Sequence, residues 1–113
     1  MTIQELKNRD GYDFECTLSK REALKGIKKF VTFDEWGVAC VWLGEDIGVE
    51  YNFCIDDDVN SSAIYKMEFD YESGYMKTDY DTFIHYEIDY NDRKWKKNLE
   101  DAMCKALIEF FDI

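Results

Sequence analysis

The amino-acid sequence predicts one α+β domain, in which helices pack on one face of a mostly antiparallel, twisted sheet of four to six strands. Segments of alternating apolar and polar residues predict the strands, and apolar residues at three- and four-residue steps predict helices, including a long C-terminal one. The 113 residues contain no proline and no linker-like stretch, so a single domain over 1–113 is expected. Hydrophobic residues form 46% of the chain, too much for a disordered acidic tail.

The first third of the chain predicts two helices separated by a strand. Thr2 to Glu5 has the form of a capping box, so a short helix should run to about Arg9. Strict alternation from Tyr12 to Leu18 then predicts a half-buried strand. A second capping box at Ser19 to Glu22 precedes an apolar stripe from Ala23 to Val31, whose other sides are rich in lysine and arginine. We expect a basic helix there.

Further strands are predicted in the central part of the chain. Ser73 and Gly74 can close a two-residue hairpin, which would place Lys77 opposite Asp70 as a favourable cross-strand pair. The strands are predicted by the run 38–43, which is apolar on both faces, and by the alternating segments 49–55, 65–71 and 84–90.

The C-terminal segment predicts a helix that lies across the sheet. Asn91 or Asp92 can cap it, and apolar residues recur at helical steps from Trp95 to Phe110. We expect this stripe to cover the inner face of the sheet. The polar sides of the strands would then share the opposite, outer face.

Negative charge is concentrated in the central half of the chain. Residues 31–91 carry fifteen carboxylates and only two basic side chains, Lys66 and Lys77, while the net charge of the whole chain is −11. Carboxylates at alternate positions of a strand lie roughly 6.6–7 Å apart, close to the spacing of phosphates along a nucleic-acid strand. Such a face would attract basic partners and would oppose direct binding to nucleic acid or anionic lipid.

We therefore expect the outer face and its adjoining loops to bind a basic protein, with nearby exposed tyrosines as apolar anchors. The alternative is that these acids are only the solvated faces of an acidic protein. Like charges on adjacent strands destabilise a sheet, however, and here few lysines interrupt them. The outer face should also include Asp13 and Glu15, and its centre should be Glu68, Asp70, Glu72, Glu87 and Asp89. The candidate partner-binding residues are Glu50, Asp56, Asp57, Asp58, Glu68, Asp70, Glu72, Asp79, Asp81, Glu87 and Asp89.

No motif predicts catalysis, a metal or a cofactor. The segment 56–62 begins like a calcium loop, but Ser61 stands in place of the required glycine and Met67 in place of the closing acid. The single histidine, His85, lies beside Glu87 and could act as an acid-base group. No nucleophile, phosphate-binding loop or zinc spacing accompanies it. We predict a protein that is not an enzyme and has no cofactor.

The cysteines and the hydropathy pattern predict a cytoplasmic protein. Cys16, Cys40, Cys54 and Cys104 are widely spaced, form no Cys-x-x-Cys pair and are expected to be reduced thiols. No apolar run approaches the roughly 20 residues that span a bilayer, and the first residues lack a signal-peptide pattern.

In its size, its charge and its aromatic-rich α+β pattern, the chain resembles the small acidic anti-CRISPR proteins of phages and mobile elements. The resemblance implies a non-catalytic inhibitor in the bacterial cytoplasm that binds the basic nucleic-acid-binding surface of a Cas effector nuclease and blocks guide RNA or DNA by acidic mimicry. The chain is also similar to immunity proteins that neutralise bacterial nuclease toxins. A third possibility is a self-associating structural or regulatory protein, in which the Trp42 strand or the basic helix forms a subunit interface. The chain would then be a homodimer, whereas the other two possibilities also allow a monomer.

Overall fold

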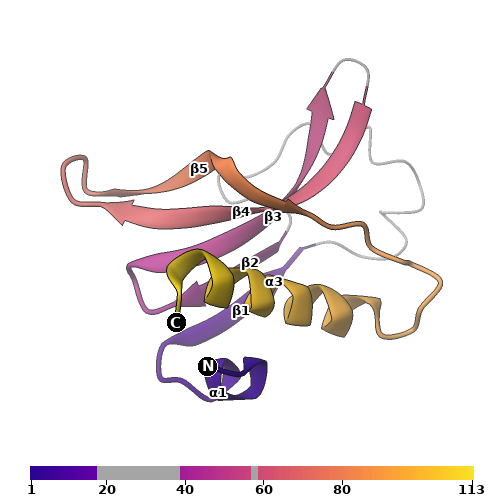
Figure 1. Cartoon of the computed structure of the whole chain (residues 1–113), viewed down its shortest axis with the longest axis horizontal. Coiled ribbons are helices and arrows are strands. Elements are labelled where there is room, and N and C mark those ends of the chain that lie inside the picture. Colours follow the sequence, from indigo (N-terminus) through magenta and orange to yellow (C-terminus); the bar gives the residue numbers. More distant parts are fainter. Residues whose placement is uncertain (18–38, 57–58) are drawn as a thin grey trace.

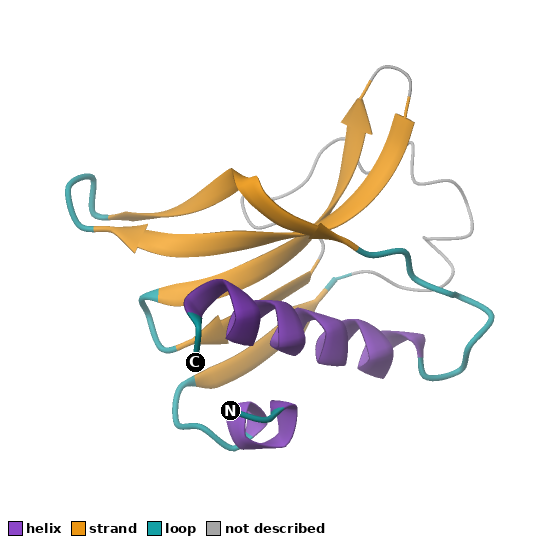
Figure 2. Cartoon of the chain, in the orientation of Figure 1, coloured by secondary structure: helices purple, strands orange, loops and turns teal. Residues whose placement is uncertain are grey.

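The computed structural model describes residues 1–17, 39–56 and 59–113 and has the predicted α+β architecture (Figures 1 and 2). The predicted basic helix after Ser19 lies outside the described residues, as do Asp57 and Asp58. The elements are α1 (Ile3–Lys7), β1 (Tyr12–Cys16), β2 (Ala39–Leu43), β3 (Ile47–Asp56), β4 (Val59–Asp70), β5 (Tyr75–His85) and α3 (Trp95–Phe111).

The five strands form an antiparallel sheet in the order β1-β2-β3-β4-β5. Neighbours in sequence are therefore neighbours in space, and short connections join β2 to β3, β3 to β4 and β4 to β5. The register places Phe14, Val41, Val49 and Lys66 in one row across β1 to β4. Residues directly opposite one another share a face, so this row shows which side chains lie on the same side of the sheet.

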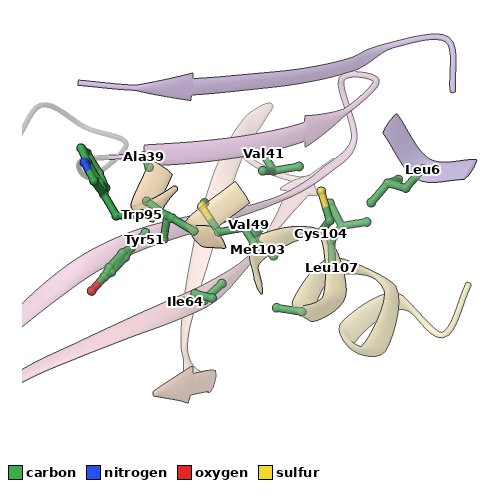
Figure 3. Close-up of a cluster of buried hydrophobic side chains, with 12 residues drawn as sticks. Leu6, Ala39, Val41, Val49, Tyr51, Ile64, Trp95, Met103, Cys104 and Leu107 are labelled. Atoms are coloured by element: carbon green, nitrogen blue, oxygen red, sulfur yellow. The ribbon is translucent and has the colours of Figure 1, made fainter. Parts of the chain in front are cut away.

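Helix α3 lies across one face of the sheet and buries the apolar core against it (Figures 1 and 3). Leu99, Met103 and Leu107 have no exposed surface, and they pack with Val41 and Val49 of the sheet. Burial of such a side chain stabilises the fold by roughly 1.5–3 kcal/mol relative to leaving it exposed. The C-terminal helix and its orientation confirm the prediction from the sequence.

The start of α3 differs from the prediction in detail. The N-cap position is Lys94, not Asn91 or Asp92, and its side chain makes no capping bond. Asp92 still supports the helix start, because its Oδ1 accepts the Lys94 N–H at 2.9 Å and its Oδ2 accepts the Asn98 amide at 3.0 Å. Asp92 thus stabilises the start of the helix from a position two residues before the N-cap.

The centre of the opposite face of the sheet is also buried. Cys40, Tyr65 and Met67 are at most 4% exposed, although register places them on the side away from α3. Gly48 lies in this layer between Trp42 and Met67, and a Cβ atom there would lie 2.8 Å from the Val41 carbonyl oxygen and 3.0 Å from the Trp42 ring. Only glycine allows the indole ring to pack so closely on the strand.

The last predicted strand, 84–90, is only partly a strand. Strand β5 ends at His85. Tyr86 still donates its N–H to the Ser62 carbonyl of β4, and the chain from Glu87 to Tyr90 then leaves the sheet on its way to α3. The predicted alternation nevertheless persists, because Tyr86, Ile88 and Tyr90 pack against the core while the residues between them are exposed. An extended segment that lies along the edge of the core shows the same two-residue alternation as a strand, even though it is not paired in a sheet.

Candidate protein-binding surface

The predicted single acidic face is not formed, because the strands present their acids on both sides of the sheet. Glu68 lies opposite Ile47, whose face is that of Val49 and α3, and Asp70 shares this face two residues on. Asp13 and Glu15 lie opposite Trp42 and Cys40, on the other face. The prediction assumed that the apolar set of every strand faces the helices. In β4 it is Tyr65, Met67 and Phe69 that face away from α3, because this sheet buries both faces at its centre.

Glu50 was predicted to be an exposed partner-binding acid, and this is wrong. The residue is 1% exposed and lies between Cys40 and Tyr65 in the buried layer away from α3. Its neighbours in sequence, Val49 and Tyr51, are fully buried on the α3 side. A carboxylate in that position is part of the interior and cannot form a docking surface. The Asp56 side chain lies outside the described part of the chain.

Three of the predicted binding acids instead hold local backbone turns. Asp70, Asp79 and Asp89 each accept a backbone N–H from the residue two positions later, at 3.0–3.1 Å. This is the Asx-turn pattern, in which a short carboxylate replaces a backbone carbonyl. Their carboxylates are therefore partly committed to the fold.

The hydrogen bonds of Asp70 and Asp79 shift their acidity. The Lys77 ammonium, together with the Glu72 N–H and Ser73, lowers the pKa of Asp70 to about 2. The Thr82 hydroxyl, which donates to Oδ2 at 2.7 Å, and the Asp81 N–H lower the pKa of Asp79. Hydrogen bonds to the charged form favour it. Both carboxylates are therefore ionised at neutral pH and keep these hydrogen bonds.

Strand β5 contains a bulge at the turn that Asp79 holds. Tyr65 of β4 lies opposite Phe83, but the next residue, Lys66, lies opposite Asp79, so 80–82 have no partners in β4. A bulge of this kind bends an edge strand and redirects its side chains. It places the aromatic ring of Tyr80 5.4 Å from that of Tyr65.

The end of the β4–β5 hairpin carries exposed tyrosines. Strand β4 has no register partner in β3 beyond Glu68, and the turn after Asp70 projects at the left edge of the molecule in Figure 1. Tyr71 is 77% exposed, Tyr75 73% and Tyr80 65%. Large exposed rings are costly in water and are enriched at interface hot spots. Composition alone gave no signal for which of the eight tyrosines would be exposed.

Acids surround these rings. The segment 66–85 holds five carboxylates and two lysines. Within the described residues the carboxylates of Glu72 and Asp81 make no hydrogen bond or ion pair, and Glu68 makes only a 3.9 Å contact with Lys66. A hollow of about 370 Å³ is lined by residues of both strands, Glu68, Phe69, Asp70, Lys77, Thr78 and Asp79. We call the hairpin segment 68–81 the acidic hairpin.

The two remaining predicted acids, Glu87 and Asp89, lie outside the acidic hairpin. Both are exposed on the segment that leads from β5 to α3, beyond the end of the sheet. They do not continue a row of acids on a sheet face. The structure therefore brings Glu68, Asp70, Glu72, Asp79 and Asp81 together and leaves the other candidates apart.

A second group of titratable residues connects α1 and β1 to α3. The Tyr12 hydroxyl donates to Glu100 at 2.5 Å and lies 3.3 Å from the Cys104 sulfur, while Lys7 pairs with Asp101 at 2.6 Å. Burial raises the pKa of the Cys104 thiol. A thiol that is protonated and buried is a poor nucleophile, so this group acts as a structural link.

Within the part of the chain that the structure describes, no cluster of histidine, cysteine, aspartate or glutamate has the arrangement of a metal site. His85 is exposed and stacks edge-on against Phe83, with 5.0 Å between ring centroids. No helix among the described residues is both long and apolar enough to cross a membrane. No protein family, curated protein or solved structure matches this chain.

Proposed function

We propose that this chain is a non-catalytic inhibitor that binds the basic nucleic-acid-binding surface of another protein through its acidic hairpin. The observation that carries the proposal is the combination, on one projecting hairpin, of carboxylates with Tyr71, Tyr75 and Tyr80 at 65–77% exposure. Carboxylates steer a basic partner and fix its register, whereas buried rings supply most of the affinity.

The proposed mechanism is competition for the groove that holds nucleic acid. Lys and Arg side chains that normally neutralise phosphates would pair with Glu68, Glu72 and Asp81, whose carboxylates are exposed. Each such pair would replace a phosphate contact, so bound inhibitor and bound nucleic acid exclude one another. A narrow hairpin fits a groove better than a flat plate does. Glu68, Asp70 and Asp79 share one face of this hairpin, so they would pair with one wall of the groove.

A Cas effector nuclease is the target that we propose, in line with the resemblance to anti-CRISPR proteins. The test is guide-RNA binding and DNA cleavage by a panel of purified Cas effectors, with this chain added before or after the guide. The proposal predicts inhibition when the chain is added first and weaker inhibition when the groove is already occupied. If the chain leaves guide binding and cleavage unchanged for the whole panel, the target class is wrong; a panel of bacterial nuclease toxins then tests the immunity alternative.

A matched pair of variants separates the acidic hairpin from the overall charge. The hairpin variant combines Glu68→Gln, Glu72→Gln and Asp81→Asn, which leaves the turn bonds of Asp70 and Asp79 intact. The control variant changes the net charge by the same amount with Asp10→Asn, Asp13→Asn and Glu15→Gln, all exposed and remote from the hairpin. Inhibition should be lost in the first variant and kept in the second. Equal inhibition by both would contradict the proposed surface.

A further inference from the structure

The C-terminal part of β5 has an open hydrogen-bonding edge. The Tyr86 N–H donates to the Ser62 carbonyl at 3.1 Å, so Ser62 and Tyr86 form a hydrogen-bonded pair of the antiparallel ladder. Such pairs alternate with non-hydrogen-bonded ones. The pairs that Phe83 and His85 form with β4 are therefore of the second kind, and their N–H and C=O groups point away from the sheet. No described residue bonds to those four groups.

This short edge lacks the features that protect the rest of β5. Edge strands are normally blunted by charged side chains, proline or a bulge. The first part of β5 carries Lys77 and ends in the bulge held by Asp79. The segment Phe83-Ile84-His85 has none of these features, and Phe83 is 42% exposed.

A groove runs beside the open edge on the α3 side. It has a volume of about 290 Å³ and is lined by Ile64, Ile84, Tyr86, Ala102, Lys105, Ala106 and Glu109. That volume lies at the lower limit of small-molecule sites, and it suits one branched apolar side chain. Because Ile84 pairs with Ile64 on the α3 face, a residue placed opposite Ile84 by an added strand would direct its side chain into this groove.

The charges around the edge favour a basic occupant. Asp81 lies just before the edge and Glu87 and Asp89 just after it, and all three are exposed. A second copy of this chain would bring the same acids against one another, and each copy has a net charge of −11. Like charges across paired strands are destabilising, so self-pairing is disfavoured relative to a segment rich in Lys and Arg.

We propose that Phe83–His85 binds an extended basic segment of a partner protein as a sixth, antiparallel strand, with one leucine-like side chain in the α3 groove. This is β-augmentation, in which main-chain hydrogen bonds give affinity and a side-chain pocket gives specificity. The proposal shares with the proposed function only the basic character of the partner. It concerns a different surface from the acidic hairpin.

The test uses the full chain and the synthetic peptide acetyl-Arg-Lys-Thr-Leu-Thr-Lys-Arg-amide, followed by NMR. Saturating peptide should shift the amide signals of Phe83 and His85 and slow their hydrogen exchange. N-methylation of a threonine next to the leucine removes an N–H that faces β5 and should weaken binding about tenfold or more. N-methylation of the leucine removes an N–H that faces away and should leave the affinity nearly unchanged. Three outcomes would overturn the proposal. The unmodified peptide and the two N-methylated peptides could bind with equal affinity, the amide shifts could be confined to 70–77, or no amide signal could shift at millimolar peptide.

Protein variants separate this site from the acidic hairpin. Ala102→Leu fills the groove from a partly exposed position and should abolish peptide binding, while the neighbouring rim variant Lys105→Ala should keep it. Circular dichroism checks that both remain folded. The hairpin variant should bind the peptide as the wild type does, so failure of the inhibitor proposal would leave this result intact. Concentration-dependent dimerisation that protects the Phe83 and His85 amides without peptide would identify a second copy as the occupant and contradict the proposal.

Discussion

The Lys77 Nζ atom lies 2.7 Å from Oδ2 of Asp70, diagonally across the β4–β5 hairpin, whereas the residue directly opposite Lys77 is Glu68. The sequence predicted the partner of Lys77 correctly but placed it at the wrong position in the ladder. A two-residue turn at Ser73 and Gly74 would have set the two residues face to face. The turn holds four residues instead, closes with Asp70 opposite Tyr75, and moves the register by two.

The diagonal pair predicts a local dependence on pH. The pKa of Asp70 is lowered from 3.8 to about 2, so the Asp70 contacts are fully present above about pH 4 and are lost as pH falls through about 2. A carboxyl titration followed by NMR should give a midpoint near pH 2. Lys77→Met should raise this midpoint, and Lys66→Met should leave it in place. A midpoint near the ordinary value in the wild type would contradict the described hairpin.

Gly48→Ala should destabilise the fold by about 2–3 kcal/mol, because the new methyl group meets the Val41 carbonyl and the Trp42 ring. Urea unfolding measures the change. Gly44→Ala serves as the control: a Cβ there meets nothing within 4 Å, and only the cost of a positive φ of 68°, about 1 kcal/mol, is expected. If both substitutions cost the same, the close packing of Trp42 on β3 is not the reason for glycine at 48.

The cysteines should differ in reactivity. Cys16 is partly exposed, while Cys104 is fully buried and burial raises the pKa of its thiol. Alkylation with iodoacetamide, mapped by mass spectrometry, should label Cys16 well before Cys104 under native conditions. In urea both thiols should react at similar rates. Faster native labelling of Cys104 would mean that α3 does not stay packed on β1.

Asp112→Gly should stabilise the C-terminal end of α3. Asp112 is the C-cap and has a left-handed backbone with a φ of 51°, which strains a residue with a Cβ atom. The gain should be about 0.5–1 kcal/mol, measured by thermal unfolding. Asp112→Ala is the control and should give no such gain. Equal stability of the two variants would argue against this cap geometry.

The fold class, most strand positions and the α3 stripe were predictable because each depends on local periodicity. When both faces of a sheet are buried, local periodicity cannot show which set of alternating side chains faces the helix. Alternation separated Tyr65 and Met67 from Lys66 and Glu68 correctly, but it could not tell which set faces α3. The burial of Glu50 follows from the same two-sided packing.

The acids of the candidate surface were predictable as a group but not in their roles. An aspartate that holds a turn has the same composition signal as one that faces a partner. Asp79 became a turn residue because β5 has a bulge, and a bulge is a relation between two strands rather than a property of one. The exposure of Tyr71 and Tyr75 likewise depends on how far the hairpin extends beyond β3.

The most direct test of the proposed binding surface is the hydrogen-exchange footprint of this chain when it is mixed with each Cas effector of the proposed panel. If the acidic hairpin is the binding surface, protection on binding should be concentrated in 68–81. The combined variant Tyr71→Ser and Tyr75→Ser should then lose both the footprint and the inhibition, while its unfolding midpoint stays nearly unchanged. Protection that falls on α1 and β1 with the hairpin amides unaffected would contradict the proposed surface.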